Sequence, residues 1–464
     1  MKFGGRSVDT GKKILQVADL INDYRKKGNE IVGVFSAIDG MTDQILDVSE
    51  SVRKGDRKAI KEFLDKTKEA HIKIVEYSIK DSILKSKALS AIEDLVSEMR
   101  DVFNGIVILH EVTPKILDHL LSFGERLLAP IISFILQERK IDSVALAGKE
   151  AGILTDSNFG EARPLMDTTK LRLKHNIEPL LKENKIPVIT GFIGADQNGN
   201  TTTLGRGGSD YTATILAASL DADEVFLWGD VDGLMTADPK IISNARVLKE
   251  VSFAEATELS LFGAKYMHPR ALEPVLDSNI PVHIRNTSKL THKGTIISKN
   301  TSKSAKKIVK SIIAIRHTAL IDVSGGGMVG TPGTAARIFE SLAKKKVNIM
   351  MISQSPSESS ITMVVRKDDL DTATTTLDLT LLGKVIRNLK VNDDVAVIAV
   401  VGSGMRGIKG VAARVFSSVA KDNVNVIMIA QGSSELNLAF VVNDSDCEKA
   451  VKSLHSAFEL EKLD

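Results

Sequence analysis

The chain is poor in cysteine, in aromatic residues and in net charge. Of its 464 residues one is cysteine, Cys447, 4% are aromatic, and 61 basic against 59 acidic residues leave a net charge of +2. A single cysteine excludes a disulfide framework and a cysteine metal site within the chain. The balanced charge provides no general field that attracts nucleic acid, so we do not expect a DNA- or RNA-binding role.

The sequence also lacks long apolar runs and a recognisable leader. No apolar run reaches the roughly 18 residues of a membrane span, and the opening MKFGGRSV does not have the pattern of a signal peptide. The nine histidines are scattered, without a pair at metal-ligand spacing. We therefore expect a cytoplasmic protein of about two to four domains that does not bind a membrane.

Short apolar runs alternate with helical patterns over roughly the first 300 residues. We expect buried strands at Glu30–Phe35, Ser143–Leu146, Ile186–Phe192 and Glu224–Trp228, and helices through most of 42–140. Strands that alternate with helices predict an α/β domain with a mainly parallel sheet.

The C-terminal part of the chain contains a duplicated module. Gly327–Val365 and Gly404–Val442 align with an offset of 77 residues and are identical at about half their positions. Each copy predicts a strand, a glycine loop, an amphipathic helix and two further strands, and a lysine- and serine-rich stretch precedes the pair. We therefore expect an α/β domain at 1–298, a linker at 299–310, and two modules at 311–392 and 393–464, which pack together or dimerise.

The segment TTTLGRGGSDYTA, at 201–213, is the most informative motif. Its glycines allow close backbone approach and positive φ angles, and Arg206 offers a planar fork that suits a carboxylate or phosphate. Ser209 and Asp210 can cap a helix that begins near Tyr211. The segment lies between two predicted strands, which indicates a βαβ unit with a ligand loop at the sheet edge rather than a plain turn.

Several other polar residues are candidates for ligand binding, and each can instead have a purely structural role. Lys2, with Gly4 and Gly5, can hold a phosphate or can be a solvated chain end. Ser36 and Thr42 can bind a ligand or cap a helix. Glu125 stands in an apolar helical pattern and, taken alone, is expected to be exposed. Further candidates are Asp230 and Asp232, which can face a ribose or Mg²⁺ or form a turn, and Lys265, which can reach phosphates or solvent.

Taken together, these motifs resemble those of the aspartokinases in the amino-acid kinase family. The matching strings occur in the family's order: KFGG, FSAIDGMT, SFGE, TTTLGRGGSDYTA, WGDVDGLMTADP and FGAKYMHP. The duplicated module resembles the family's tandem ACT modules. The resemblance implies a carbamate kinase-like three-layer α/β sandwich, with a mainly parallel sheet, followed by two ferredoxin-like βαββαβ modules. It also implies that strand 311–317 can belong to the second module.

The resemblance implies an aspartate kinase, a phosphotransferase that acts on a carboxyl group. Its cofactors would be ATP and Mg²⁺, with the metal held mainly by the ATP phosphates rather than by the protein. The product would be 4-phospho-L-aspartate, in the first step of lysine, threonine and methionine biosynthesis. The implied catalytic residues are Lys2, Gly4, Gly5 and Asp210. The implied substrate-binding residues are Ser36, Thr42, Glu125, Arg206 and Ser209, of which Arg206 would bind the α-carboxylate and Glu125 the ammonium group. The implied nucleotide-binding residues are Gly229, Asp230, Met235, Lys240 and Lys265.

The family also implies feedback regulation by an end-product amino acid that binds the ACT modules of a homodimer or a dimer of dimers. Threonine is favoured over lysine as the effector. The candidate effector contacts are Met328, Thr331, Gly333, Thr334, Ile349 and Gln354, with a structural role in the turn and core as the alternative for each.

The sequence departs from the family pattern at three places. Arg6 replaces a threonine in KFGGTSV, Gly229 replaces a threonine before Asp230, and the family normally has a few residues before the lysine at position 2. The first two departures leave open a second hypothesis, a non-catalytic amino-acid sensor that retains the kinase fold.

Overall fold

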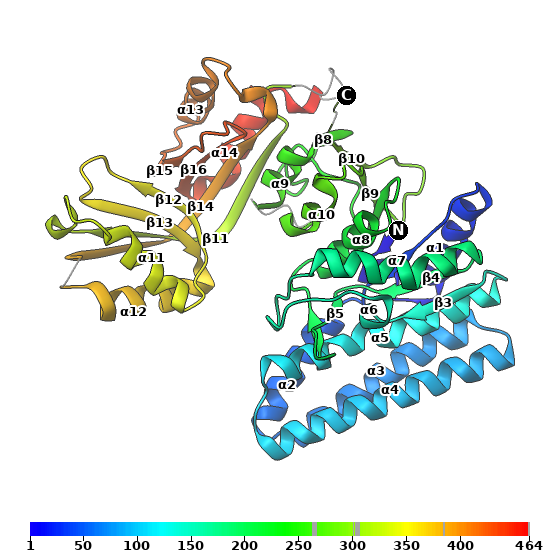
Figure 1. Ribbon diagram of the computed structural model, residues 1–464. Coiled ribbons are helices and arrows are strands. Elements are labelled where there is room, and N and C mark those ends of the chain that lie inside the picture. The colour runs from blue at the N-terminus through cyan, green and yellow to red at the C-terminus, as the bar shows by residue number, and fades with distance from the viewer. Residues whose placement is uncertain (262–266, 300, 302–306, 384–385, 463–464) are drawn as a thin grey trace. The chain divides into compact units, whose positions relative to one another are not determined.

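The computed structural model describes residues 1–261, 267–299, 301, 307–383 and 386–462 (Figure 1). They form two compact units. Unit 1 comprises the described residues of 1–233, 249–253 and 266–300, and unit 2 comprises those of 234–248, 254–265 and 301–464.

Unit 1 is built on a mainly parallel sheet. Within the described residues the sheet has eight strands in the order β3-β4-β2-β1-β7-β9-β10-β8, and only the β9–β10 pair is antiparallel. The strands are β1 Lys2–Phe3, β2 Gly33–Phe35, β3 Ser143–Leu146, β4 Ile186–Thr190, β7 Val225–Gly229, β8 Glu250–Ser252, β9 Val282–Asn286 and β10 Thr295–Ser298. A separate hairpin pairs β5 Ile193–Ala195 with β6 Thr201–Thr203.

Long helices cover this sheet. Several of them begin at an N-cap residue whose side-chain carboxylate or hydroxyl accepts backbone N–H groups of the first turn. Asp81, for example, accepts the N–H groups of Ile83 and Leu84, both at 2.9 Å, at the start of α4. The helices of unit 1 are α1 Gly11–Lys26, α2 Met41–Arg53, α3 Arg57–Ser78, α4 Ser82–Leu109, α5 Pro114–Glu138, α6 Gly148–Ala151, α7 Met166–Lys182, α8 Gly208–Ser219 and α10 Glu273–Leu276.

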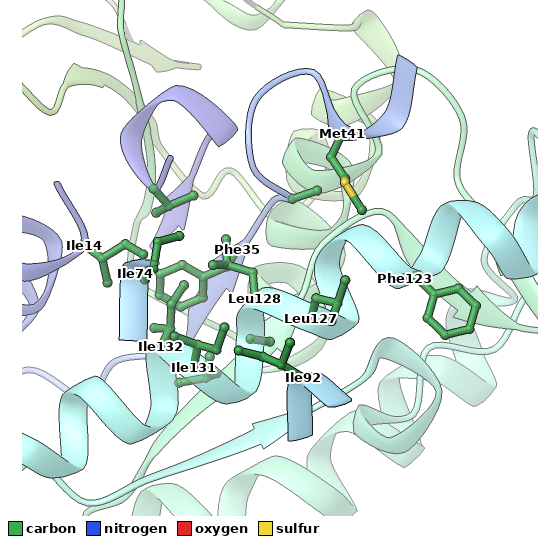
Figure 2. Packing of buried hydrophobic residues seen from close by; sticks show 14 of the residues in the cluster. Ile14, Phe35, Met41, Ile74, Ile92, Phe123, Leu127, Leu128, Ile131 and Ile132 are labelled. Carbon is green, nitrogen blue, oxygen red and sulfur yellow. The ribbon is translucent and has the colours of Figure 1, made fainter. Parts of the chain in front are cut away.

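Helix α5 is the central element of the unit 1 core. Its apolar face packs against β2 and the neighbouring helices through Leu127, Leu128, Ile131 and Ile132 (Figure 2). Among the described residues, α5 alone is long and apolar enough to cross a membrane, but 78% of its apolar window is buried inside the unit. Its burial is therefore that of a core helix.

The four predicted strands are all present, but the predicted βαβ unit is more elaborate. β4 and β7 are parallel members of one sheet with α8 between them in sequence, yet β2 and β1 separate them in space and the β5–β6 hairpin precedes α8. Helix α8 also begins at Gly208, so Ser209 and Asp210 lie in its first turn rather than capping it. The N-cap is Gly207, whose φ of 71° favours a residue without a Cβ atom.

Unit 2 contains the duplicated module. Its six described strands follow the order β12-β13-β11-β14-β16-β15. They are β11 Ser311–Ser324, β12 Ile349–Gln354, β13 Ser360–Arg366, β14 Asn388–Val401, β15 Met428–Ala430 and β16 Asn437–Asn443. The helices are α9 Phe253–Leu261, α11 Thr334–Lys344, α12 Leu370–Leu381, α13 Val411–Lys421 and α14 Cys447–Ala457. The offset of 77 residues that relates the two sequence copies also relates α11 to α13.

The long strand β11 serves both modules. Its first part, 311–315, pairs with 397–401 of β14, beside β16, whereas its second part, 318–324, pairs with β13 of the first module. A register shift between Ile315 and Thr318 separates the two parts.

A buried ion pair links α9 to the strand that enters the modules. Lys310 Nζ lies 2.7 Å from Glu255 Oε2, and the side chains are 3% and 0% exposed. The other carboxylate oxygen of Glu255 accepts the N–H of Ser403 at 2.9 Å, at the glycine turn of the second module. The Glu255 carboxylate therefore joins three parts of unit 2: helix α9, the end of the predicted linker and the second module.

We expect Lys310→Met to lower the free energy of unfolding by about 3–5 kcal/mol, because it removes the ammonium group from a buried carboxylate. The matched control is Lys344→Met, which removes an exposed ion pair with Glu340 and should cost about 0.5 kcal/mol. Denaturant unfolding of both variants measures the difference. Equal, small effects would show that the buried pair does not stabilise unit 2.

Candidate functional site

One cavity of unit 1 gathers most of the residues that the sequence singled out. It has a volume of about 600 Å³ and opens where β1, α5 and the glycine loop before α8 converge. The predicted residues that line it are Lys2, Gly5, Ser36, Thr42, Glu125, Arg206, Ser209 and Asp210. Residues up to 208 positions apart in sequence therefore share one site.

Lys2 is fixed at this cavity by the short central strand β1. Phe3 is buried and its ring stacks with Phe35 and Trp228 at centroid distances of 5.3 and 6.5 Å. Because neighbouring side chains of a strand point to opposite faces, Lys2 faces away from that stack. Its Nζ lies 2.6 Å from Asp210 Oδ1, with side chains 13% and 12% exposed. Asp210 thus holds the ammonium group in the cavity.

The structure contradicts the prediction that Gly4 helps Lys2 to hold a phosphate through its N–H group. That N–H donates to the Trp228 carbonyl at 3.0 Å, because it continues the pairing of β1 with β7. Gly4 does not line the cavity, whereas Gly5 does. A Cβ atom at Gly5 would lie 2.7 Å from the Ala37 carbonyl oxygen, so the turn packs closely on the neighbouring loop.

The glycine loop presents Arg206 between two residues in the left-handed region. Gly205 has φ 75° and Gly207 has φ 71°, and both conformations are costly for other residues. Arg206 is exposed and lines the cavity. The guanidinium therefore stands at the cavity surface, where it can reach an anion from solvent.

Glu125 is buried, contrary to the expectation from its residue type alone. Its side chain lies on the cavity face of α5, and Oε1 accepts the Ala37 N–H at 3.1 Å. Within the described residues Oε2 has no hydrogen-bond partner. Burial raises the pKa of this carboxyl group to about 8. A buried carboxyl group with one unpaired oxygen in a cavity is a site for a cation.

Sequence reasoning missed Asp118, which also lines the cavity. Oδ2 accepts the N–H groups of Gly160 at 3.0 Å and Thr203 at 2.8 Å, and Oδ1 accepts the Thr203 hydroxyl at 2.8 Å. Asp118 therefore ties α5 to strand β6, which leads into the glycine loop. Burial raises its pKa, and the three hydrogen bonds oppose that shift. The available signal was spacing, because Asp118 and Glu125 are seven residues apart and so share one face of a helix.

The predicted nucleotide residues fall in different parts of the chain. Gly229 ends β7 in unit 1 and Asp230 follows it. The Gly229 carbonyl accepts the N–H and hydroxyl of Thr287 at 2.9 and 3.0 Å. Met235 and Lys240 belong to unit 2. Lys265 lies outside the described residues. The roles of these last three residues stay predictions.

The predicted effector residues cluster around the first glycine loop of unit 2. Met328 is 2% exposed and packs in the core of the first module, which favours its packing role over a ligand contact. The Thr334 hydroxyl donates to the Thr331 carbonyl at 2.9 Å, and Gly333, at φ 85°, caps α11. Ile349 and Gln354 begin and end the edge strand β12.

Comparison with known proteins identifies the two parts of the chain. The model of the amino acid kinase family matches residues 1–286, and the ACT domain model matches residues 321–380 and 398–458. Aspartate kinase from Pseudomonas fluorescens is 31% identical over 99% of this chain and 97% of its own length.

Two crystal structures of E. coli aspartokinase III cover 98% of both chains. The complex with aspartate and ADP, in the R-state, is 29% identical with a TM-score of 0.83. The complex with lysine and aspartate, in the T-state, is 28% identical with a TM-score of 0.81.

Longer relatives also match. The chloroplastic bifunctional aspartokinase/homoserine dehydrogenase of Daucus carota is 31% identical over 99% of this chain, which spans about half of that relative's length. The matches over the full length of the Pseudomonas enzyme and of aspartokinase III agree with the fold and the motif order. The chain belongs to the amino acid kinase family, among the aspartokinases with C-terminal ACT domains.

Proposed function

We propose that the chain transfers the γ-phosphoryl group of MgATP to the side-chain carboxylate of L-aspartate. The observation that carries this proposal is the cavity that holds the Lys2–Asp210 pair, Arg206 and the buried Glu125 together. The E. coli relative in complex with aspartate and ADP supports it.

Each group has a distinct chemical task in this proposal. Arg206 donates to the α-carboxylate of aspartate, and ionised Glu125 accepts from its ammonium group. The side-chain carboxylate is already ionised at neutral pH, so it needs no general base. One of its oxygens forms a bond to the γ-phosphorus, the bond from that phosphorus to the bridging oxygen breaks, and ADP leaves with the electron pair. Lys2 stabilises the charge on the transferring phosphoryl oxygens.

The residues present fit a magnesium ion that arrives with ATP. Within the described residues no group of three or more His, Cys, Asp or Glu side chains forms a metal site, and Asp210 is engaged by Lys2. Phosphate oxygens would therefore supply most of the ligands. When bound, Mg²⁺ neutralises negative charge on the β- and γ-phosphoryl groups.

A series of acceptors tests this function, with the acyl phosphate trapped by hydroxylamine. L-Aspartate should give product, whereas succinate, which lacks the ammonium group, and 3-aminopropanoate, which lacks the α-carboxylate, should each react at least about a hundredfold more slowly. Equal rates with succinate would remove Glu125 from substrate recognition. No product from a chain that binds MgATP would instead favour the non-catalytic sensor.

We further propose that an end-product amino acid, threonine rather than lysine, binds the ACT modules of a homodimer and inhibits the kinase. The candidate contacts on the loop of the first module are Thr331, Gly333 and Thr334, with Ile349 and Gln354 on β12. E. coli aspartokinase III in complex with lysine is a related precedent for an amino-acid ligand. The exposed Ile352 on edge strand β12 is suited to burial against a second copy.

The segment that carries Met235 and Lys240, two of the predicted nucleotide residues, is a ready route for this regulation, because it belongs to unit 2. The Thr236 hydroxyl lies 3.1 Å from His455 Nε2 of α14, and the Ile312 N–H donates to the Thr236 carbonyl at 2.8 Å. Ala237 and Ile242 pack in the core of the second module. A shift within that module therefore moves the segment that carries Met235 and Lys240.

We expect His455→Leu to raise the effector concentration for half-inhibition about fivefold, since it removes one buried hydrogen bond worth about 1 kcal/mol. The KM for aspartate should stay unchanged. Inhibition curves with threonine and with lysine measure the shift, and His175→Leu, at an exposed position of α7, is the control. Inhibition curves identical to those of the wild type would exclude this route.

A further inference from the structure

Arg6, which is absent from the family pattern, occupies a defined position beside the glycine turn. It directly follows Gly4 and Gly5 and lies in the turn Gly5–Ser7. Its carbonyl accepts a hydrogen bond from the Lys13 ammonium group at 2.8 Å. The backbone that carries the Arg6 side chain is therefore held at both ends, by the close packing of Gly5 on Ala37 and by Lys13.

The Arg6 guanidinium bridges two carboxylates that come from different loops. Nη1 lies 2.7 Å from Asp230 Oδ2, and Nε lies 3.2 Å from Asp39 Oδ2. Asp39 lines the cavity, whereas Asp230 follows β7 in the segment that is predicted to bind the nucleotide. If the chain binds aspartate in the cavity and MgATP beside β7 as proposed, the triphosphate has to extend between these two places.

The two ion pairs hold Arg6 only weakly. The Arg6 side chain is 63% exposed, and those of Asp39 and Asp230 are 53% and 50% exposed. Exposed pairs of this kind contribute little, because water screens them. A single phosphate group can accept two guanidinium N–H groups at once, and it carries more negative charge than a carboxylate. An arriving triphosphate can therefore compete with the carboxylates for Arg6.

We propose that Arg6 is a triphosphate-binding residue that Asp39 and Asp230 hold in readiness. When MgATP binds, the guanidinium exchanges the two carboxylates for oxygens of the β- and γ-phosphoryl groups. Arg6 also offsets the two carboxylates, which would otherwise repel a polyanion at this turn. This inference rests on the proposed function, and it adds a nucleotide contact that the family motif does not contain.

The rival explanation is purely structural: Arg6 is a fixed clasp, that is, an ion-pair link that only holds the loops of Asp39 and Asp230 together. The two explanations differ in the effect of Asp39. If Arg6 binds phosphate, removal of the Asp39 charge frees the guanidinium and removes a repulsive charge. If Arg6 is a clasp, loss of either partner breaks the same link, and Arg6→Thr and Asp39→Asn should weaken nucleotide binding alike.

Calorimetric titration of the full chain with MgATP, without aspartate, distinguishes them. We expect Arg6→Thr to weaken MgATP binding about ten- to a hundredfold, as befits a lost hydrogen-bonded charge, and Arg6→Lys to weaken it less. Asp39→Asn should bind MgATP as well as the wild type or better. The salt dependence of binding should be shallower in Arg6→Thr than in the wild type. Thermal unfolding of each variant checks that the fold is retained.

Three outcomes would overturn the proposal. MgATP binding that is unchanged in Arg6→Thr, or weakened equally in Asp39→Asn, removes Arg6 from the triphosphate while leaving the kinase proposal intact. A wild-type chain that does not bind MgATP at all contradicts the proposed function and this inference together.

Discussion

Replacement of Lys2 by methionine is expected to reduce kcat about a hundred- to a thousandfold or more. The Lys2 ammonium group lies 2.6 Å from Asp210 Oδ1 inside the cavity, at a strand end that packing fixes in place. A preorganised charge at the transferring group stabilises the transition state more than the ground state, so its loss should affect kcat more than either KM.

Steady-state kinetics of Lys2→Met with saturating MgATP and aspartate measure this effect. Lys12→Met, at an exposed position of α1, is the matched control and should retain the wild-type rate. Asp210→Asn should lower kcat less than Lys2→Met, because the ammonium group remains. A wild-type kcat in Lys2→Met would exclude Lys2 from phosphoryl transfer.

The KM for aspartate is expected to fall about tenfold between pH 7 and pH 9. Burial raises the pKa of Glu125 to about 8, so only about a tenth of the free chain carries the carboxylate at pH 7. The ammonium group of aspartate binds the ionised form, so binding displaces a proton and tightens as the pH rises. Glu125→Gln should raise the KM about a hundredfold and abolish its pH dependence.

Stability provides an independent check on the titration of Glu125. Its folded-state pKa of about 8 lies above the ordinary glutamate pKa of 4.5 that applies in the unfolded chain, so the native state holds this proton more tightly. The stabilisation is complete at low pH and is lost as the pH rises from about 4.5 to about 8. Relative to Glu125→Gln, the wild type should lose stability over this range. A flat KM profile together with a flat stability difference would contradict the assignment.

The sequence predicted the strands and the duplicated module because both depend on local patterns. Short apolar runs between helical patterns indicate buried strands, and the 77-residue offset between the two module copies is visible by direct comparison. The family motifs implied that both Lys2 and Asp210 are catalytic, but their contact could not be predicted, because a contact across 208 residues leaves no local signal. The apolar pattern around Glu125 did not decide whether it is buried, since its exposure depends on where α5 lies in the fold.

The errors arose where tertiary pairing overrides residue type. Gly4 was predicted to offer a free N–H, but strand pairing with Trp228 uses it. Asp118 was missed because its partners come from β6 and from Gly160, which are distant in sequence. The segment 234–248 was predicted within the first domain, yet its packing partners lie in the second module. Each outcome depends on contacts that the fold creates.

The most direct measurement is the number of aspartyl β-hydroxamate molecules formed per ADP released. The wild-type chain is incubated with MgATP, L-aspartate and hydroxylamine, with and without threonine. If one cavity holds both aspartate and the transferring phosphoryl group, hydroxamate and ADP should appear in a ratio of about one to one, and both should require aspartate. ADP release without hydroxamate, or no aspartate-dependent ADP release at all, would contradict the assignment of this cavity as an aspartate kinase site.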